Sequence, residues 1–352
     1  MIALLFSLLG IAISLFLVFY VHDAYLAVKY QSFVDQQKEQ MRSDSKKRVD
    51  PNSLFIATDL SKSVEDNCRL DYEYQVAYYL HTGVDRSSDK NSGRPSKTFV
   101  FLHGLGGQMA QFEGLFNFIP KEYSVFSLDY CGCGLSKRAF NSHIGRSPRE
   151  LTTDGLTNII EKVIEKHIFP SDSIVLVGHS MGASIATRLA KRLGGKCEAL
   201  VLLAPKNRFK KGELELIRRI QKIPSPIFSL YRLFDRWKGL NSPSVNRCFS
   251  SKATPAQRAK LWIWNRESDT FIWKMMLMGI ESVLTPSFVF PSVPTLIITG
   301  DEDSISPPSE KELYQDLQND FSFQVVEAGH CLLVEKPHEI YQKIHSFLRL
   351  PN

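Results

Sequence analysis

The segment Gly178-His179-Ser180-Met181-Gly182 has the residue types and spacing best suited to chemistry. It follows the apolar run 174–177 and precedes the alanine-rich segment 183–190. A serine on a tight strand-to-helix turn projects its hydroxyl free of the backbone, and the flanking glycines let neighbouring backbone approach closely. The N–H of Met181 would then face the oxygen that becomes negative during attack on a carbonyl. The pattern predicts Ser180 as a nucleophile, although a glycine-flanked turn without chemistry has the same residues.

A serine nucleophile needs a positioned base, and two later segments offer the missing groups. One apolar run ends in Gly300-Asp301-Glu302-Asp303, which places three carboxylates just past a predicted strand. Another ends in Gly329-His330. The order serine, acid, histidine is the one expected for a serine turn of this kind. From spacing alone His330 is the candidate base, and any of the three carboxylates is a candidate to orient it.

Four motifs, taken in order, resemble those of the α/β-hydrolase fold family of serine hydrolases across about residues 70–350. They are the loop Phe101–Gly107 (F-L-H-G-L-G-G), the turn Asp129–Ser136 (D-Y-C-G-C-G-L-S), the segment 178–182, and the pair Gly300-x-x-Asp303 and Gly329-His330. More loosely, residues 99–116 and 202–206 are similar to fungal lipid-droplet lipases of this fold.

The resemblance implies a role for each matching residue. Ser180 would be the nucleophile, His330 the general base and acid, and Asp303, the second acidic position of its turn, the residue that orients the histidine. The oxyanion hole would use the backbone N–H groups of Met181 and Leu105. These five residues are the predicted site.

Other residues near these motifs are assigned lesser roles or exclude related activities. Gly106 is the alternative to Leu105, Asp301 is expected to cap its turn, and His103 and His179 are expected to be structural. Acyltransferase relatives carry an aspartate where this chain has Glu335, which removes support for that activity. Epoxide-hydrolase relatives use an aspartate nucleophile, whereas the position here is Ser180.

Short apolar runs alternating with helical patterns predict a mostly parallel sheet with helices on both faces, the α/β-hydrolase fold. A Tyr-rich strand is expected at Asp71–His81 and an exposed loop at 83–97. Further strands are expected at Thr98–Leu102, Ser124–Leu128, Ser173–Val177, Ala199–Leu203, Thr295–Thr299 and Phe323–Val326, and helices at Leu151–His167, Met181–Leu193, Ser309–Leu317 and His338–Leu348.

The alternation is interrupted over residues 207–290, which we predict to be a helical cap insertion. This segment contains all four tryptophans and the cluster Met275-Met276-Leu277-Met278. It also carries 15 Lys and Arg against six Asp and Glu, so the net charge of +6 of the whole chain is concentrated here. Aromatic and methionine side chains suit adaptable apolar binding, and cations suit anionic headgroups. In helices, however, the same residues commonly form core and solvated surface.

Residues 2–21 carry no charge and match the length of a bilayer-spanning helix. We predict a transmembrane anchor at 1–21, a linker or partly helical stalk at 22–50 and the hydrolase domain at 51–352. A cleaved signal peptide would have a basic start and a small-residue cleavage site, and neither is present. The Lys and Arg residues that follow the span, and the absence of any N-x-S/T sequon, predict a cytosolic catalytic domain.

Composition excludes several other classes of protein. The charge of +6 comes without a basic block or nucleic-acid motif, so no nucleic-acid partner is expected. Six scattered cysteines do not form a disulfide framework, and Cys131-Gly132-Cys133 lacks the second ligand pair of a metal site. Acyl transfer to serine needs no metal or cofactor, and none is expected.

The sequence therefore predicts a single-pass membrane protein, at the endoplasmic reticulum or a lipid droplet, that hydrolyses carboxylic esters through an acyl-enzyme. Lipid esters are the expected substrate class, with the membrane contacted by the N-terminal helix and the basic cap. The alternatives are a thioesterase or small-ester carboxylesterase, and a non-catalytic membrane scaffold built on the same fold.

Overall fold

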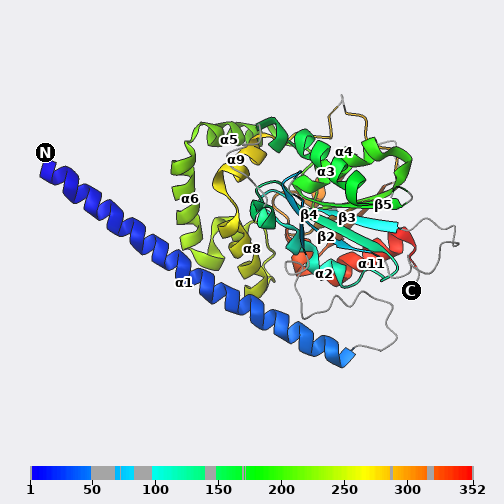
Figure 1. The fold of residues 1–352 in the computed structure, drawn as a ribbon, viewed down its shortest axis with the longest axis horizontal. Helices are drawn as coiled ribbons and strands as arrows, with labels where there is room; N and C mark the ends of the chain where they lie inside the picture. The colour runs from blue at the N-terminus through cyan, green and yellow to red at the C-terminus, as the bar shows by residue number, and fades with distance from the viewer. Residues whose placement is uncertain are drawn as a thin grey trace.

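The computed structural model describes residues 2–48, 68–71, 73–82, 97–138, 148–168, 170, 172–285, 288–314 and 321–350. The first residues of the predicted hydrolase domain, 51–67, and the predicted loop 83–97, except for Lys97, lie outside these ranges. The described part consists of a long N-terminal helix, a central sheet flanked by helices, and a group of helices beside the sheet (Figure 1).

The sheet has eight strands in the order β1-β2-β4-β3-β5-β6-β7-β8. Strands β4, β3, β5, β6, β7 and β8 run parallel, and β1 and β2 pair antiparallel at one edge. The predicted mostly parallel sheet is confirmed. Their bounds are β1 Arg69–Asp71, β2 Val76–His81, β3 Lys97–Leu102, β4 Ser124–Asp129, β5 Ser173–His179, β6 Cys197–Leu203, β7 Thr295–Gly300 and β8 Phe321–Val326.

Two predicted elements differ from the structure. The expected strand Asp71–His81 is a hairpin, because a turn at residues 73–75, with Gln75 at a φ of 55°, reverses the chain between β1 and β2. The expected helix Ser309–Leu317 is a 3₁₀ segment, η7 (Pro308–Tyr314), and residues 315–317 lie outside the described part of the chain. Turn residues in polar segments are poorly separated from strand and helix by periodicity alone.

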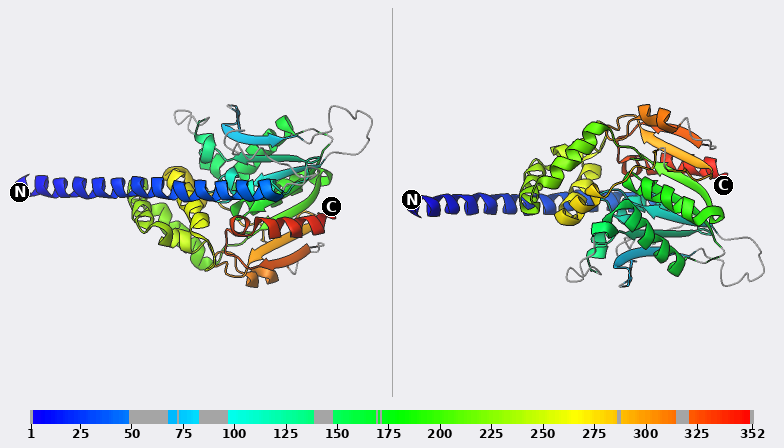
Figure 2. Two further views of the ribbon diagram at one scale, coloured as in Figure 1. Left: turned by 90° about the horizontal axis from the view of Figure 1, so that it is seen from below. Right: turned by 90° about the horizontal axis from the view of Figure 1, so that it is seen from above.

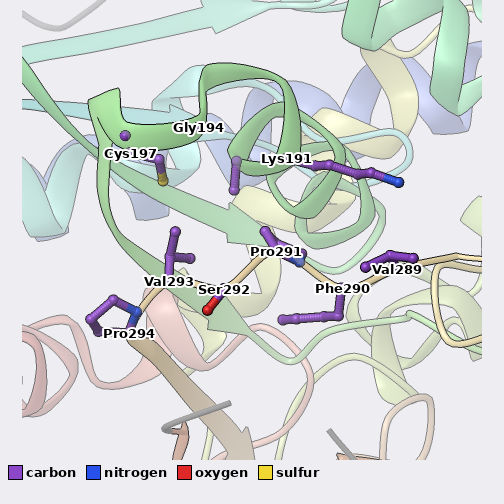
Figure 3. A pocket seen from close by; sticks show the side chains of 11 residues that line it. Lys191, Gly194, Cys197, Val289, Phe290, Pro291, Ser292, Val293 and Pro294 are labelled. Carbon is purple, nitrogen blue, oxygen red and sulfur yellow. The ribbon is translucent and has the colours of Figure 1, made fainter. Parts of the chain in front are cut away.

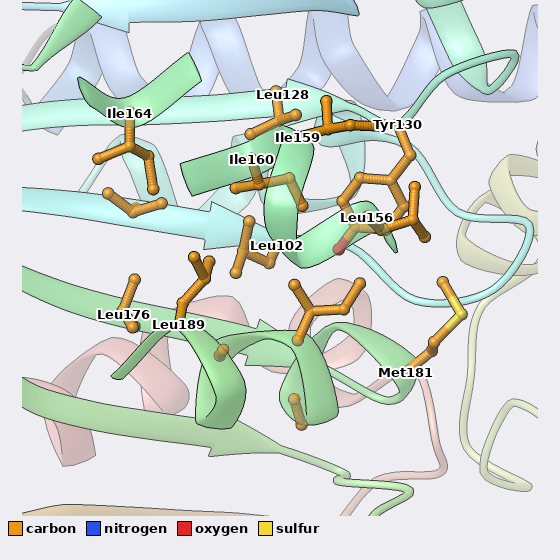
Figure 4. Packing of buried hydrophobic residues seen from close by; sticks show 14 of the residues in the cluster. Leu102, Leu128, Tyr130, Leu156, Ile159, Ile160, Ile164, Leu176, Met181 and Leu189 are labelled. Atoms are coloured by element: carbon orange, nitrogen blue, oxygen red, sulfur yellow. The ribbon is translucent and has the colours of Figure 1, made fainter. Parts of the chain in front are cut away.

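Helices cover both faces of the sheet (Figure 1). On one face α3 (Thr153–His167) and α4 (Met181–Leu193) pack through leucine and isoleucine side chains onto the sheet residues Leu102, Leu128 and Leu176 (Figure 4). On the other face, α2 (Glu113–Phe116), α10 (Leu332–Glu335) and α11 (Pro337–Leu348) bury a second cluster. The two buried faces explain why the central strands read as continuous apolar runs.

The segment between β6 and β7 is helical, as predicted for the cap. Its elements are α5 (Lys211–Lys222), α6 (Ser225–Trp237), η6 (Gly239–Asn241), α7 (Pro243–Asn246), α8 (Pro255–Glu267) and α9 (Thr270–Met278). Ser242 and Thr254 cap α7 and α8, and Asp269 caps α9, each by accepting a backbone N–H. We refer to helices α5 to α9 as the cap.

The N-terminal helix α1 extends without interruption from Ile2 to Arg48. The segment predicted as a linker or partly helical stalk, 22–50, is helical over its described residues, 22–48. Its amino-terminal part projects beyond the rest of the chain, whereas its middle lies against the cap (Figures 1 and 2). One apolar stretch among the described residues, Ile13–Gln36, has the length and composition to cross a membrane.

The same segment of α1 contacts the cap, which the sequence analysis did not predict. Leu26, Tyr30 and Val34 recur every four residues and are buried against Trp262 and its neighbours on the cap. The Tyr30 ring packs edge-on to that of Trp262, 5.0 Å between centroids. These three apolar positions form one stripe of the helix. Their spacing builds an interface in the segment that was predicted as a linker or stalk.

Candidate active site

Ser180 occupies a strained turn between β5 and α4. Its backbone has φ 53° and ψ −117°, a conformation that residues with a Cβ rarely adopt. The turn is tight because neighbouring backbone fills the space beside its glycines. A Cβ on Gly182 would lie 2.1 Å from the carbonyl oxygen of Leu102, and one on Gly178 would lie 2.4 Å from that of Gly182. The spacing of the five-residue motif is thus explained by contact of the turn with β3 and with the start of α4.

The structure brings the three predicted triad residues together at the carboxyl ends of the parallel strands. Ser180 follows β5, Asp303 follows β7 and His330 follows β8. The Ser180 Oγ lies 2.8 Å from His330 Nε2, and His330 Nδ1 lies 2.9 Å from Asp303 Oδ2. Because a carboxylate only accepts, Nδ1 carries the proton and donates it, which leaves Nε2 to accept the serine hydroxyl proton. This is the geometry of a nucleophile with its base and an orienting acid.

Asp303, rather than its two acidic neighbours, faces the histidine. Its Oδ1 accepts hydrogen bonds from the backbone N–H groups of Ile305 and Ser306 at 2.8 and 2.9 Å, which leaves Oδ2 for His330. The Asp301 carboxylate accepts from the Ala328 N–H at 2.9 Å, and Glu302 accepts from Ser251 of the cap. The predicted turn-capping role of Asp301 agrees with this arrangement.

The charges of the pair stabilise one another. Burial lowers the pKa of His330, but the charge of Asp303 and its hydrogen bond outweigh burial and hold that pKa above its usual value. Burial raises the pKa of Asp303, but His330 and the N–H groups of Ser306 and Ile305 outweigh it, so the pKa is lowered. Asp303 is therefore a carboxylate near neutral pH, and His330 is a base that gains a proton readily.

The raised pKa of His330 predicts the pH dependence of hydrolysis. A general base acts in its neutral form, so kcat/KM of the free enzyme should rise with pH and reach half its plateau above pH 6.5, the usual value for histidine. Titrating kcat/KM for a soluble ester between about pH 5 and about pH 9 measures this midpoint. A midpoint below 6.5 would show that burial, and not Asp303, dominates the basicity of His330.

His103 and His179 are structural, as predicted. Burial lowers the pKa of His103 to about 4, and burial together with His330 lowers that of His179 to about 3, so both are neutral. His103 Nδ1 lies 2.8 Å from the Gly104 carbonyl and its Nε2 accepts from the Tyr130 N–H. His179 Nε2 lies 2.9 Å from the carbonyl oxygen of His330. His179 thus holds the backbone of the base in place.

The loop after β3 lies directly beside the nucleophile. A Cβ on Gly104 would be 3.0 Å from the Cβ of Ser180. None of the backbone hydrogen bonds of the described turns and loops uses the N–H of Leu105 or Met181. The loop is braced by Asp129, which accepts from the Met109 N–H at 2.6 Å and from the Leu135 N–H at 2.7 Å. The two predicted oxyanion donors therefore flank Ser180 on elements that are held by other bonds.

The cap rests on this loop, through a tryptophan that the sequence analysis did not single out. At Gly106, whose φ is +69°, a Cβ would lie 2.8 Å from the indole ring of Trp273 on α9. Trp273 in turn stacks on Phe228 of α6 at 5.6 Å. Of the aromatic and methionine residues in the predicted cap, Trp262 and Met276 are fully buried. Much of that composition is therefore core, and Trp273 is the tryptophan placed over the site.

Two further charged residues position the site and were missed. The buried Lys206 donates to the carbonyl of Ile305 at 2.9 Å, in the turn that carries Asp303, and pairs with Glu213 of α5 at 2.9 Å. Glu335 accepts from the Gly329 N–H at 2.8 Å and also from Ser250 of the cap. The burial of Lys206 and the hydrogen bonds of the half-buried Glu335, which a single sequence does not display, distinguish them from ordinary surface charges.

Within the described part of the chain, no cluster of His, Cys, Asp and Glu could hold a metal ion. Cys131 and Cys133 are buried, and burial raises the pKa of the Cys133 thiol. A pocket of about 490 Å³ lies away from the triad, at the amino ends of the strands (Figure 3). It is lined by the end of α4 and by residues 289–294 before β7, so it is not part of this site.

Comparison with known proteins gives two findings on the family. Residues 97–337 match a family model described as the alpha/beta hydrolase fold. An abhydrolase domain-containing protein of Schizosaccharomyces pombe is 43% identical over 348 residues, covering 97% of this chain and 93% of the relative. The matched region contains β3 to β8, the cap and all three residues of the hydrogen-bonded triad.

Two more distant proteins are also similar. Lipid droplet hydrolase 1 of Saccharomyces cerevisiae is 26% identical over 293 residues, covering 71% of this chain and 75% of the relative. A crystal structure of a membrane phospholipase A superposes with a TM-score of 0.58 at 17% identity, covering 98% of this chain and 97% of that one. At this identity the second likeness concerns the fold alone.

Proposed function

The chain belongs to the α/β-hydrolase fold family, and we propose that it is a serine hydrolase that cleaves carboxylic esters, with lipid esters as its substrates. The observation that carries the proposal is the continuous hydrogen-bonded path from Ser180 Oγ through His330 to Asp303. A serine that only shapes a turn does not require an oriented base beside its hydroxyl. Here the base is oriented, and a buried carboxylate raises its pKa, as a nucleophile requires. This path also argues against a scaffold that has lost its chemistry.

The proposed reaction has two acyl transfers. His330 Nε2 takes the hydroxyl proton as Ser180 Oγ bonds to the ester carbonyl carbon, and the N–H groups of Met181 and Leu105 stabilise the oxyanion. The bond to the leaving alcohol breaks as His330 returns the proton to it. Water, deprotonated by His330, then attacks the acyl-enzyme and releases the acid. The Ser180 oxygen regains its proton, so the enzyme returns to its starting state without a metal or cofactor.

Three observations support a lipid ester over a soluble one. The uncharged amino-terminal part of α1, residues 2–21, would hold the domain at a bilayer. The cap, which rests on the loop after β3, presents exposed apolar side chains, among them Leu230 and Phe234. A relative of the chain is named for hydrolysis at lipid droplets. We propose that α1 anchors the protein as a single-pass membrane protein of the endoplasmic reticulum or lipid droplet, with the catalytic domain in the cytosol.

The reaction class is tested by a fluorophosphonate probe on the full chain in liposomes. We expect one adduct per chain, recovered on the peptide that contains Ser180, because an assembled nucleophile reacts with the probe and unactivated serines do not. The matched control is His330→Gln, which keeps the serine but lacks the base and should label far more slowly. A folded chain that stays unlabelled in liposomes would support the scaffold instead.

The substrate class is tested with the same preparation. A lipid ester, a thioester and a soluble ester are compared below and above the concentration at which the lipid ester forms micelles. For a lipid hydrolase we expect the rate on the lipid ester to increase when the aggregate forms, since the substrate is then met at an interface. Turnover of the soluble ester or the thioester that exceeds turnover of every lipid ester would favour the alternative substrate classes.

A further inference from the structure

One face of α6 is apolar and exposed. Ile227, Leu230, Tyr231, Phe234 and Trp237 recur every three or four residues, and all are exposed, Tyr231 by 64% and Ile227 by 59%. Residues with this spacing form one stripe along a helix, which we call the α6 stripe. The opposite face of the helix carries the buried Phe228. A contiguous apolar stripe on the surface of a folded protein indicates contact with an apolar partner.

The α6 stripe is continuous with the apolar surface of α1. The ring of Phe19 on α1 lies 4.5 Å from that of Phe234 and 4.2 Å from that of Trp237. Trp237 also lines a largely apolar groove of about 530 Å³, together with Leu17, Val18, Val21, His22 and Tyr25 of α1. Figure 1 places α6 at the side of the cap that faces the projecting part of α1. Whatever surrounds the projecting part of α1 is therefore within reach of the stripe.

The position of α6 relative to α1 is fixed by a buried ion pair. Asp23 on α1 is largely buried and accepts from Nε of Arg236 on α6 at 3.0 Å and from Nε of Arg266 on α8 at 2.8 Å. An ionised carboxylate with two arginines is costly in the hydrocarbon of a bilayer. If α1 enters a bilayer, Asp23 therefore favours a position outside the hydrocarbon, and it joins α1 to both cap helices at that level.

The length of α1 places the stripe at the membrane surface. The helix from Ile2 to Phe19 contains 18 residues, which corresponds to about 27 Å at 1.5 Å per residue. The hydrocarbon core of a bilayer is about 30 Å thick. If α1 spans the bilayer up to Phe19, then Phe234 and Trp237, which contact Phe19, lie at the boundary between acyl chains and headgroups. Trp and Tyr side chains favour this boundary.

We propose that α6 lies on the same bilayer that α1 enters, with the α6 stripe seated at the acyl–headgroup boundary of an anionic leaflet. The proposal rests on the membrane attachment proposed above and not on the reaction. Exposed cations at the end of α5, namely Arg218, Arg219 and Lys222, adjoin the start of α6 and complement an anionic surface. A second copy of the chain would bring these cations against one another, which argues for the membrane as the occupant.

The proposal is tested by photolabelling from within the membrane. The full chain is reconstituted in liposomes whose phosphatidylcholine carries a diazirine on an acyl chain, with and without phosphatidylserine, and adducts are mapped by mass spectrometry. We expect adducts on residues 225–237 as well as on α1, and more of them when phosphatidylserine is present. Adducts confined to α1 would overturn the proposal, as would chain-to-chain cross-links through α6 in place of lipid adducts.

Substitutions then assign the labelling to the stripe. Leu230→Glu combined with Tyr231→Glu changes two exposed side chains and should lower the labelling of α6 by about tenfold, with α1 unchanged. Val289→Glu, at a residue 71% exposed beside the distant pocket, is the matched control and should leave the labelling unchanged. Because labelling needs no turnover, Ser180→Ala should label like the wild type. Failure of the esterase proposal would therefore leave this test unaffected.

Discussion

Replacing Ser180 with glycine is expected to abolish ester hydrolysis and at the same time to raise the free energy of unfolding. The loss of the nucleophile should reduce kcat by about 10⁶-fold, since the remaining groups do not substitute for it. The gain in stability follows from the backbone of Ser180, whose φ of 53° and ψ of −117° suit glycine. Such a conformation costs about 1–3 kcal/mol for a residue with a Cβ. Initial rates and chemical denaturation of the full chain measure the two effects.

Ser180→Ala is the control that separates the two effects. It removes the same hydroxyl and the same hydrogen bond to His330 but keeps the Cβ, so it should be as inactive as the glycine variant without relief of strain. Taking about 2 kcal/mol, the middle of the strain range, and allowing about 0.5–1 kcal/mol for the greater freedom of unfolded glycine, we expect Ser180→Gly to be the more stable of the two by about 1–1.5 kcal/mol. Equal stabilities would show that the turn carries no strain, and residual hydrolysis in both would remove Ser180 from the proposed mechanism.

The candidate catalytic residues could be predicted because they lie in short motifs that follow one another in a fixed order along the chain. Ser180, Asp303 and His330 each follow an apolar run, and parallel strands bring such positions to one edge of the sheet. The pairing of β3 with β5 brings Leu102 beside Gly178, which explains why the loop after β3 lies next to the turn that carries Ser180. Each of these relations depends on elements whose periodicity is strong in the sequence.

The supporting residues could not be predicted in the same way. Lys206 acts from a buried position and Glu335 through hydrogen bonds to the backbone, and their partners Glu213 and Ser250 are distant or unremarkable in the sequence. Trp273 belongs to a tryptophan-rich segment. Composition does not show that its ring contacts the loop after β3, whereas the ring of Trp262 is buried in the core. Packing between separate elements decides these positions.

The apolar residues of the cap show the same limit. The sequence pointed to the methionine cluster of the cap, yet Met276 is buried against the main core, 3.8 Å from Cys133 Sγ. The exposed apolar residues of the cap include Leu214, Leu216 and Phe271 and, as one stripe, those of α6, which lie among arginines and a lysine and do not stand out in composition. Several cap cations are likewise structural, since Arg236 and Arg266 pair with Asp23 of α1. Helical spacing combined with observed exposure identifies the stripe, whereas composition does not.

Asp303→Asn is expected to lower kcat by about 10⁴-fold while leaving the fold intact. The backbone N–H groups of Ile305 and Ser306 both donate to Oδ1, so the oxygen of an asparagine amide must take that position. Its NH₂ group then faces His330 Nδ1 and donates to it. The histidine proton is thereby moved to Nε2, the atom 2.8 Å from Ser180 Oγ. A protonated Nε2 cannot accept the serine proton. Rates on a soluble ester measure the loss.

Asp301→Asn is the matched control, because it changes the same atoms two residues away in the same turn. Asp301 is exposed and accepts only the Ala328 N–H among the hydrogen bonds described for its side chain, so we expect a loss of less than about tenfold. The pH profile adds a second readout. Loss of the Asp303 charge should move the midpoint of kcat/KM to lower pH, because that charge outweighs burial in raising the pKa of His330. A larger loss for Asp301→Asn than for Asp303→Asn would transfer the orienting role to the first acid of the turn.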